Sequence, residues 1–141
     1  MITSASILYP VFAMFLLTII VMLHLGRLRI TAIRSRQISI KFFRAYVGND
    51  EPEYMRVVSR HFVNLFEMPV LFYVGVILVY ITGQVTTWLV ACAWTYVALR
   101  YLHSYVHLTS NNITRRFACY FGSAVALVAL WVSLFVRLLA A

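Results

Sequence analysis

Three polar side chains that can bind an anion share one face of an apolar helix expected near residues 57–81. Arg60, Asn64 and Glu67 are spaced i, i+4, i+7, which brings them to the same side of a helix. A charged residue within a membrane span costs about 2.5–3.5 kcal/mol on insertion scales and by default indicates function. The spacing therefore predicts a guanidinium, an amide and a carboxylate that face a common site.

Two further apolar segments carry polar residues at the same depth. Arg100, His103 and His107 are spaced i, i+3, i+7, again on one face of a helix, and Arg116 begins the last apolar segment at that level. Glu67 is the one acidic residue among these groups. The predicted site is thus net positive, and it suits an anionic ligand that enters from the cytoplasm.

The same residues also have structural explanations, which the spacing leaves open. Glu67 can pair with Arg60 two turns away or with Arg100 across helices, and Asn64 can hydrogen-bond between helices. One carboxylate does not neutralise the three guanidiniums of Arg60, Arg100 and Arg116. That excess of positive charge favours a ligand site over a purely structural network.

The other histidines and the cysteines are expected to have ordinary roles. His24 and His61 lie near the ends of apolar segments, which predicts interfacial positions, and His107 fits the pocket and the interface equally well. Cys92 and Cys119 are far apart in apolar surroundings, without CxxC or Cys/His spacing, so we expect both to be packing residues. No metal site is predicted.

The elements that must position these groups are membrane spans. Of the 141 residues, 63% are hydrophobic and 11% are charged, whereas an ordinary soluble domain has about 25% charged residues. This composition excludes a disordered chain, a soluble nucleic-acid-binding domain and a soluble enzyme of ordinary make-up. We predict one all-α integral membrane domain over residues 1–141. Its spans lie at about 5–25, 57–81, 85–108 and 116–140, each near the ~20 residues that cross a bilayer.

The basic residues indicate how this four-helix bundle is oriented. The net charge is +8, seven basic residues lie in the long polar connection at about 26–56, and Arg115 and Arg116 follow the third span. Only Arg137 lies toward the opposite side. The positive-inside rule therefore places both chain ends away from the cytoplasm. Because the charges cluster beside apolar segments, the expected partner is membrane lipid and not nucleic acid.

Taken together, the polar motifs resemble those of the MAPEG family, the membrane-associated proteins in eicosanoid and glutathione metabolism. The resemblance extends over nearly the whole chain. It implies a four-helix bundle that assembles as a homotrimer, with a glutathione site between neighbouring subunits. The motifs that carry it are Arg60-x-x-x-Asn64-x-x-Glu67-Met68-Pro69, Arg100-x-x-His103-Ser104 and Arg115-Arg116-x-x-x-Tyr120.

The resemblance also implies roles for individual residues. Arg116 would lie beside the thiol and favour the thiolate, which is the nucleophile, because a guanidinium stays charged. The implied function is a glutathione-dependent transferase or peroxidase that acts on lipophilic electrophiles or lipid hydroperoxides. The residues expected to bind glutathione are Arg60, Asn64, Glu67, Arg100, His103, His107 and Tyr120, with Arg29 contributed by the neighbouring subunit.

Some positions depart from the family pattern. His107 stands where several members have tyrosine, Pro69 comes one residue earlier than in many members, and Val63 replaces an arginine that is frequent in eukaryotic members. These differences resemble a bacterial branch, and the expected location is the bacterial inner membrane. Since a fold does not guarantee an activity, the alternative is a non-catalytic member that binds a lipid or a protein partner. A small transporter is disfavoured because the sequence shows no inverted repeats.

Overall fold

The structure is a computed structural model that describes residues 3–46 and 51–140, and every regular element within those ranges is a helix. The all-α prediction is therefore confirmed for the described residues. In chain order the elements are the 3₁₀ helix η1 (Ser4–Leu8), α1 (Tyr9–Arg34), α2 (Phe42–Ala45), α3 (Glu53–Asn64), α4 (Met68–Ile81), α5 (Thr87–Leu108) and α6 (Ile113–Leu139).

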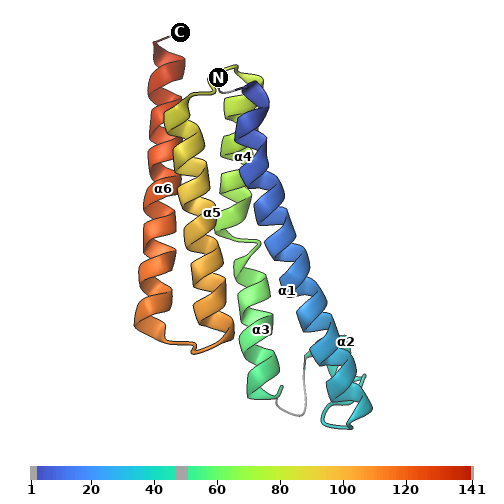
Figure 1. The fold of residues 1–141 in the computed structure, drawn as a ribbon. Helices are drawn as coiled ribbons and strands as arrows, with labels where there is room; N and C mark the ends of the chain where they lie inside the picture. The colour runs from blue at the N-terminus through green and yellow to red at the C-terminus, as the bar shows by residue number, and fades with distance from the viewer. Residues whose placement is uncertain (1–2, 47–50, 141) are drawn as a thin grey trace.

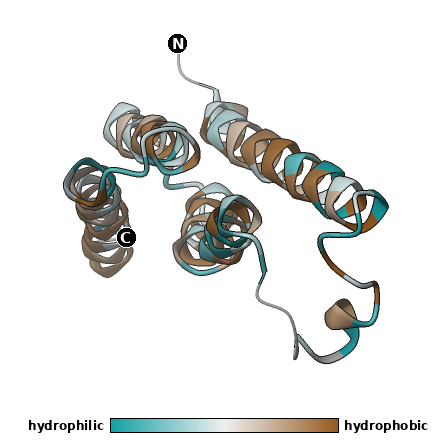
Figure 2. Ribbon diagram, turned by 90° about the horizontal axis from the view of Figure 1, so that it is seen from below, coloured by the Kyte–Doolittle hydropathy of each residue, from teal (hydrophilic) through white to brown (hydrophobic). Residues whose placement is uncertain are grey.

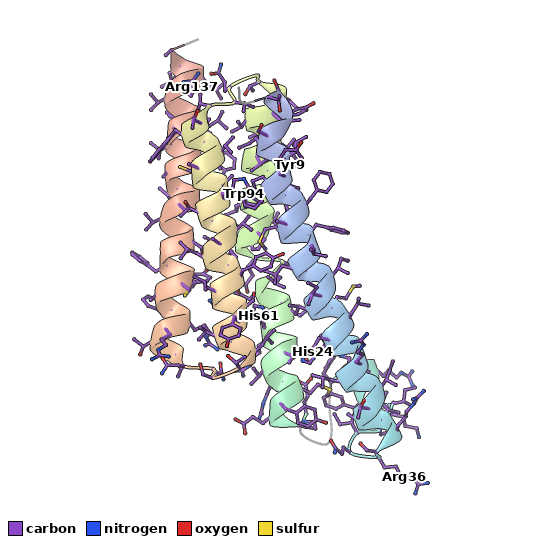
Figure 3. All side chains as sticks on the ribbon, viewed as in Figure 1. Tyr9, His24, Arg36, His61, Trp94 and Arg137 are labelled. Atoms are coloured by element: carbon purple, nitrogen blue, oxygen red, sulfur yellow. The ribbon has the colours of Figure 1, made fainter. Side chains whose placement is uncertain are left out.

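The long helices run up and down along a common direction (Figure 1). Both chain ends lie at one end of the molecule, together with the connection from α4 to α5. The connection from α5 to α6, the start of α3 and the short α2 lie toward the other end. The side chains of Arg137 and Arg36 mark these two ends (Figure 3).

Within the described parts of the chain, three helical segments are long and apolar enough to cross a membrane, namely Ser4–Arg34, Glu53–Ile81 and Ile113–Leu139. Large apolar side chains on their outer faces are exposed, including Phe12 and Phe121. Seen from one end, hydrophobic residues cover outward-facing parts of the helices as well as the contacts between them (Figure 2). Such a surface suits contact with lipid.

The expected third span forms α5, and its crossing of the membrane remains a prediction. With 22 residues the helix is long enough. It is less apolar than the three segments above because it carries Arg100, His103 and His107. The count of four spans and the orientation of the bundle are therefore predictions, whereas the three apolar helical segments are observed.

The first helix is longer than predicted. α1 continues to Arg34 instead of ending near Leu25, so that the beginning of the predicted polar connection is helical. Gly26 lies inside the helix, with open space where a Cβ would be. Arginine, leucine and alanine, which favour helices, are frequent in the extension.

The predicted second span is two helices rather than one. Pro69 has no N–H to continue the hydrogen-bond ladder, and its ring clashes with the preceding turn. α3 therefore ends at Asn64 and α4 begins at Met68, with Glu67 outside the helical region at φ −91° and ψ −93°. Figure 1 shows the irregular segment between them. The break frees main-chain carbonyls at the end of α3, where the helix dipole is negative.

Capping side chains determine where α5 and α6 begin. The Thr86 side chain accepts a hydrogen bond from the Leu89 N–H at 3.3 Å, and Asn112 Oδ1 accepts one from the Arg115 N–H at 3.0 Å. Such N-caps satisfy donors that the first turn leaves unpaired. The cap at Asn112 places Arg116 in the first turns of α6, facing the last turns of α5.

A cysteine introduced at Ser35 and one introduced at Thr82 should label from opposite sides of the membrane. The two positions flank α3 and α4 and lie at opposite ends of the molecule, and the positive-inside rule makes Ser35 cytoplasmic. The measurement uses a membrane-impermeant thiol reagent on a chain in which Cys92 and Cys119 are replaced by alanine. Labelling of both positions from the same side would contradict the predicted topology.

Candidate functional site

The break between α3 and α4 holds the guanidinium of Arg100. Its Nη2 donates to the main-chain oxygen of Asn64 at 3.1 Å and to Asn64 Oδ1 at 2.7 Å. Asn64 Nδ2 in turn donates to Glu67 Oε2 at 3.1 Å. The carbonyl of Asn64, the last residue of α3, thus receives a cation, and partners on both sides orient the amide of Asn64.

Arg100 is a buried cation that depends on this network. Its exposed fraction is 0%, and its Nε and Nη1 have no hydrogen-bond partner within the described residues. The guanidinium carbon lies 5.6 Å from the centroid of the Tyr120 ring, which is within the range of a cation–π contact. Glu67, which is exposed, is linked to Arg100 through the amide of Asn64.

A cavity of about 330 Å³ opens beside the network, near the lower end of the ~300–1,000 Å³ typical of ligand pockets. Helices α3, α5 and α6 supply its walls. Six of the lining residues are ones that the sequence analysis assigned to the site, and two are apolar additions. The lining consists of Arg60, Asn64, His103, His107, Ile113, Arg116, Phe117 and Tyr120.

Two neutral groups hold Arg116 at the cavity wall. Its Nη1 lies 2.9 Å from Asn111 Oδ1 and 3.1 Å from His107 Nε2. A guanidinium only donates hydrogen bonds, so His107 Nε2 accepts and the proton of the neutral ring lies on Nδ1. Because neither partner carries a negative charge, the charge of Arg116 remains available to an anion in the cavity.

The main chain of α6 sets the orientation of His103. Its Nδ1 lies 3.0 Å from the carbonyl oxygen of Arg116. A carbonyl only accepts, so Nδ1 is the donor, and in the neutral ring Nε2 then keeps its lone pair. The His103 ring also lies 5.9 Å from the ring of Tyr120. Imidazoles with assigned tautomers therefore line the cavity beside the guanidinium of Arg116.

The interfacial position predicted for His61 is wrong. Its exposed fraction is 0%, and its ring centroid lies 4.8 Å from that of His107. His61 belongs to the buried face of α3 with Met55 and Val58, each three residues from the next. That regular spacing is the signal in the sequence from which this position could have been found. His24, on α1, is exposed. Figure 3 shows His24 and His61 toward the end of the molecule at which α5 connects to α6.

Three residues assigned to the site from the sequence do not line the cavity. Arg100 and Glu67 belong to the network around Asn64. Arg29 is elsewhere, with its guanidinium carbon 5.4 Å from the centroid of the Phe43 ring. A contribution of Arg29 to a neighbouring subunit stays a prediction.

The apolar helices and the cationic cavity between α3, α5 and α6 define an integral membrane protein with a polar site among its helices. The sequence model of the MAPEG family matches residues 7–136. The chain therefore belongs to the MAPEG family, the membrane proteins of eicosanoid and glutathione metabolism, as the resemblance of its motifs indicated. Comparisons with curated proteins and with solved structures returned no match.

Proposed function

We propose that this chain is a glutathione-dependent transferase or peroxidase that acts within the membrane on lipophilic electrophiles or lipid hydroperoxides. The observation that carries the proposal is the cavity in which Arg60 and Arg116 share the walls with an amide and two imidazoles. Glutathione has two carboxylates, an ammonium group and a thiol. A cavity rich in guanidiniums suits its carboxylates, and a separate guanidinium is available for its thiolate.

In this proposal Arg60 binds a carboxylate of glutathione directly, because its exposed side chain lines the cavity. Asn64 offers its amide at the same wall. Arg100 is buried behind Asn64 and therefore orients that amide. This differs from the role that the family resemblance implied, in which Arg100 itself held a carboxylate.

Arg116 is the residue that we assign to activation of the thiol. A free thiol has a pKa of about 8.5 and is mostly protonated at neutral pH, whereas a guanidinium held beside the sulfur favours the thiolate. The proton leaves to water as the thiol binds. The thiolate then forms a carbon–sulfur bond and expels a leaving group from the electrophile. With a hydroperoxide it attacks the terminal oxygen and breaks the oxygen–oxygen bond, which gives a sulfenic acid and a lipid alkoxide that takes a proton from water to become the alcohol. A second glutathione then condenses with the sulfenic acid to form glutathione disulfide and water.

The apolar part of the cavity lining explains how a lipophilic substrate would arrive. Ile113 and Phe117 of α6 line the cavity, yet their side chains are 73% and 64% exposed. An apolar rim of this kind is open to the surrounding bilayer. A substrate dissolved in lipid would therefore reach the thiolate laterally.

A homotrimer completes the proposal. The isolated chain leaves large apolar side chains exposed along α1 and α4, including Phe15 and Leu71, and these faces can be covered by neighbouring subunits as well as by lipid. Subunit contacts would also bring Arg29 of one chain toward the cavity of the next.

Calorimetric titration of the detergent-solubilised protein with glutathione tests the binding part of the proposal. We expect Arg60→Ala to weaken binding about tenfold or more, because a charge-assisted hydrogen bond contributes about 1.5–3 kcal/mol and 1.4 kcal/mol is one decade. Arg137→Ala is the matched control, since Arg137 is an exposed arginine at the other end of α6, bonded to Gln84.

Absence of glutathione binding by the unaltered protein would overturn the glutathione proposal in favour of a non-catalytic lipid- or partner-binding protein. Equal binding by the Arg60→Ala and Arg137→Ala variants would instead contradict the assignment of Arg60 to the site. A glutathione analogue with a methyl group in place of the thiol should bind with similar affinity, because the carboxylates provide most of the recognition.

A further inference from the structure

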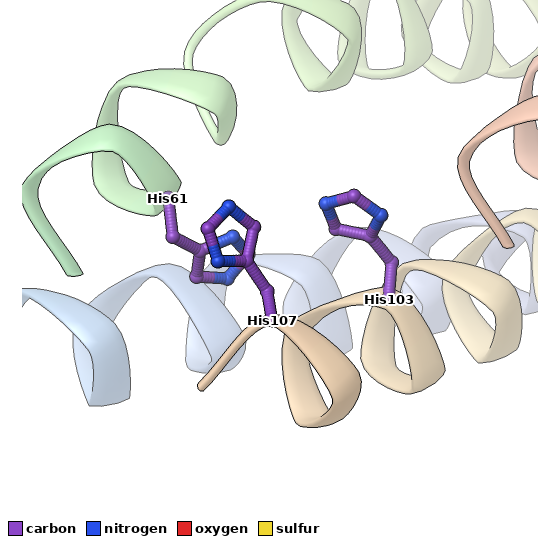
Figure 4. A group of neighbouring side chains, drawn as sticks. All are labelled: His61, His103 and His107. Atoms are coloured by element: carbon purple, nitrogen blue, oxygen red, sulfur yellow. The ribbon is translucent and has the colours of Figure 1, made fainter. Parts of the chain in front are cut away.

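Three imidazoles converge at the inner wall of the cavity. His61 comes from α3, and His103 and His107 come from successive turns of α5 (Figure 4). All three are buried, and one nitrogen from each lies within 4.8 Å of the other two. Both nitrogens of His61, Nε2 of His103 and Nδ1 of His107 have no hydrogen-bond partner among the described residues. Buried polar atoms are nearly always paired, so these four indicate a ligand.

The spacing of the rings fits a common metal ion. Their centroids are separated by 4.8 Å (His61–His107), 5.7 Å (His61–His103) and 5.7 Å (His103–His107). Three imidazoles on a tetrahedral ion, with metal–nitrogen bonds of about 2.0–2.1 Å, place their centroids about 5 Å apart. On such an ion the bonded nitrogens lie about 3.4 Å apart, so the three nitrogens, which lie within 4.8 Å of one another, have to approach by up to about 1.4 Å.

We propose that His61, His103 and His107 form a binding site for a late first-row divalent metal ion such as Zn²⁺. Three neutral imidazoles without a carboxylate suit such ions and disfavour Mg²⁺ and Ca²⁺. His103 is oriented as metal-ligating histidines usually are, since its Nδ1 donates to the Arg116 carbonyl and leaves Nε2 free. The fourth position of the ion faces the cavity that His103 and His107 line.

The hydrogen bond between Arg116 and His107 competes with metal binding at this site. Arg116 Nη1 donates to His107 Nε2, so a metal on that nitrogen displaces the guanidinium. A metal on Nδ1 moves the ring proton to Nε2, where a guanidinium can no longer donate. Metal binding and this hydrogen bond are therefore mutually exclusive, and the positive charges of Arg100 and Arg116 further oppose a dication. Removing Arg116 should strengthen metal binding.

The test uses protein purified in detergent through a tag without histidine, stripped with a chelator and dialysed against Zn²⁺. We expect one Zn²⁺ per chain by elemental mass spectrometry, and a tetrahedral visible spectrum after loading with Co²⁺. The His61→Gln and His107→Gln variants should each bind Zn²⁺ with an affinity at least about tenfold lower than that of the unaltered protein. His24→Gln, which changes the exposed histidine on α1, is the matched control and should bind normally.

The Arg116→Gln variant should change the affinity for Zn²⁺ in the opposite direction from the histidine variants. It should bind Zn²⁺ more tightly than the unaltered protein, while Arg137→Gln should not change the affinity. Absence of stoichiometric Zn²⁺ from the unaltered protein would overturn the proposal, as would equal affinities in the His61→Gln and His24→Gln variants. The spectrum of the unaltered protein decides the coordination even if a histidine variant fails to fold. None of these measurements requires glutathione, so they stand or fall separately from the proposed function.

Discussion

Replacing Arg116 with alanine should remove most of the ultraviolet absorbance of bound glutathione thiolate and slow conjugation of a model electrophile about ten- to thirtyfold at neutral pH. An opposite charge within about 4–6 Å changes a pKa by about 1–3 units, and a thiol with its free pKa of about 8.5 is only about 3% thiolate at pH 7, which limits the loss to about thirtyfold. Binding of glutathione should remain close to normal, because Arg60 and Asn64 stay in the cavity wall. The absorbance, the conjugation rate and calorimetry together measure this division of roles.

The control for Arg116→Ala is Arg115→Ala, which removes the neighbouring exposed arginine that the cavity lining does not include. Raising the pH should restore much of the rate in the Arg116→Ala variant, since the free thiol then ionises without help. If Arg116→Ala loses glutathione binding as completely as Arg60→Ala, the roles are wrongly divided although the cavity is correctly placed. No thiolate signal in the unaltered protein at any pH up to about 8.5 would contradict the enzymatic proposal.

Helical spacing was sufficient to group Arg60 with Asn64 and His103 with His107, and the structure has all four at the cavity. Arg60 and Asn64 lie one turn apart, as do His103 and His107, and these faces point toward the same space. Arg116 could be included in the same predicted site because the last span was expected to begin at the depth at which the third span ends. The prediction succeeded for these residues because the 3.6-residue period fixes neighbours on one helix and short connections fix the pairing of helices.

The predicted second span did not include the break at Pro69. Hydropathy registers whether a segment is apolar, and residues 57–81 are apolar throughout most of their length. It does not register that Pro69 lacks an N–H. In the structure α3 ends at Asn64, whose carbonyl accepts a hydrogen bond from Arg100. The sequence therefore indicated Arg100 as a ligand-binding cation. In the structure its guanidinium donates hydrogen bonds to Asn64 and so links α5 to the end of α3.

His61 was misplaced for a related reason. Its position near the end of an apolar segment suggested the interface, but α3 begins at Glu53, several residues before the predicted span. The helix thus has an additional turn before the expected boundary, in which Met55 is buried and Glu53, Tyr54 and Arg56 are exposed. Apolarity alone could not locate that boundary, since the first turns of α3 mix charged residues with the buried Met55 and Val58.

Replacing Asn64 with leucine should lower the free energy of unfolding by about 1.5–3 kcal/mol, the contribution of a hydrogen bond to a charged group. Leucine has a similar size but cannot accept from Nη2 of the buried Arg100, which is 2.7 Å from Oδ1 of the partly buried Asn64. The main-chain oxygen of residue 64 would remain as an acceptor, which keeps the loss below the about 3–5 kcal/mol of a fully unpaired buried charge.

Denaturant or thermal unfolding in detergent measures this loss, and two variants serve as controls. Asn64→Asp keeps an acceptor for Arg100 but gives up the donor to Glu67, so it should cost less than leucine. Glu67→Gln should cost least, because Glu67 is exposed and an exposed charge contributes little. The loss of stability should decrease in the order Asn64→Leu, Asn64→Asp, Glu67→Gln. This order follows only if Asn64 is the residue that stabilises the buried Arg100. Equal stabilities of Asn64→Leu and Glu67→Gln would show that Arg100 is held by other contacts, with the Tyr120 ring as the next to test.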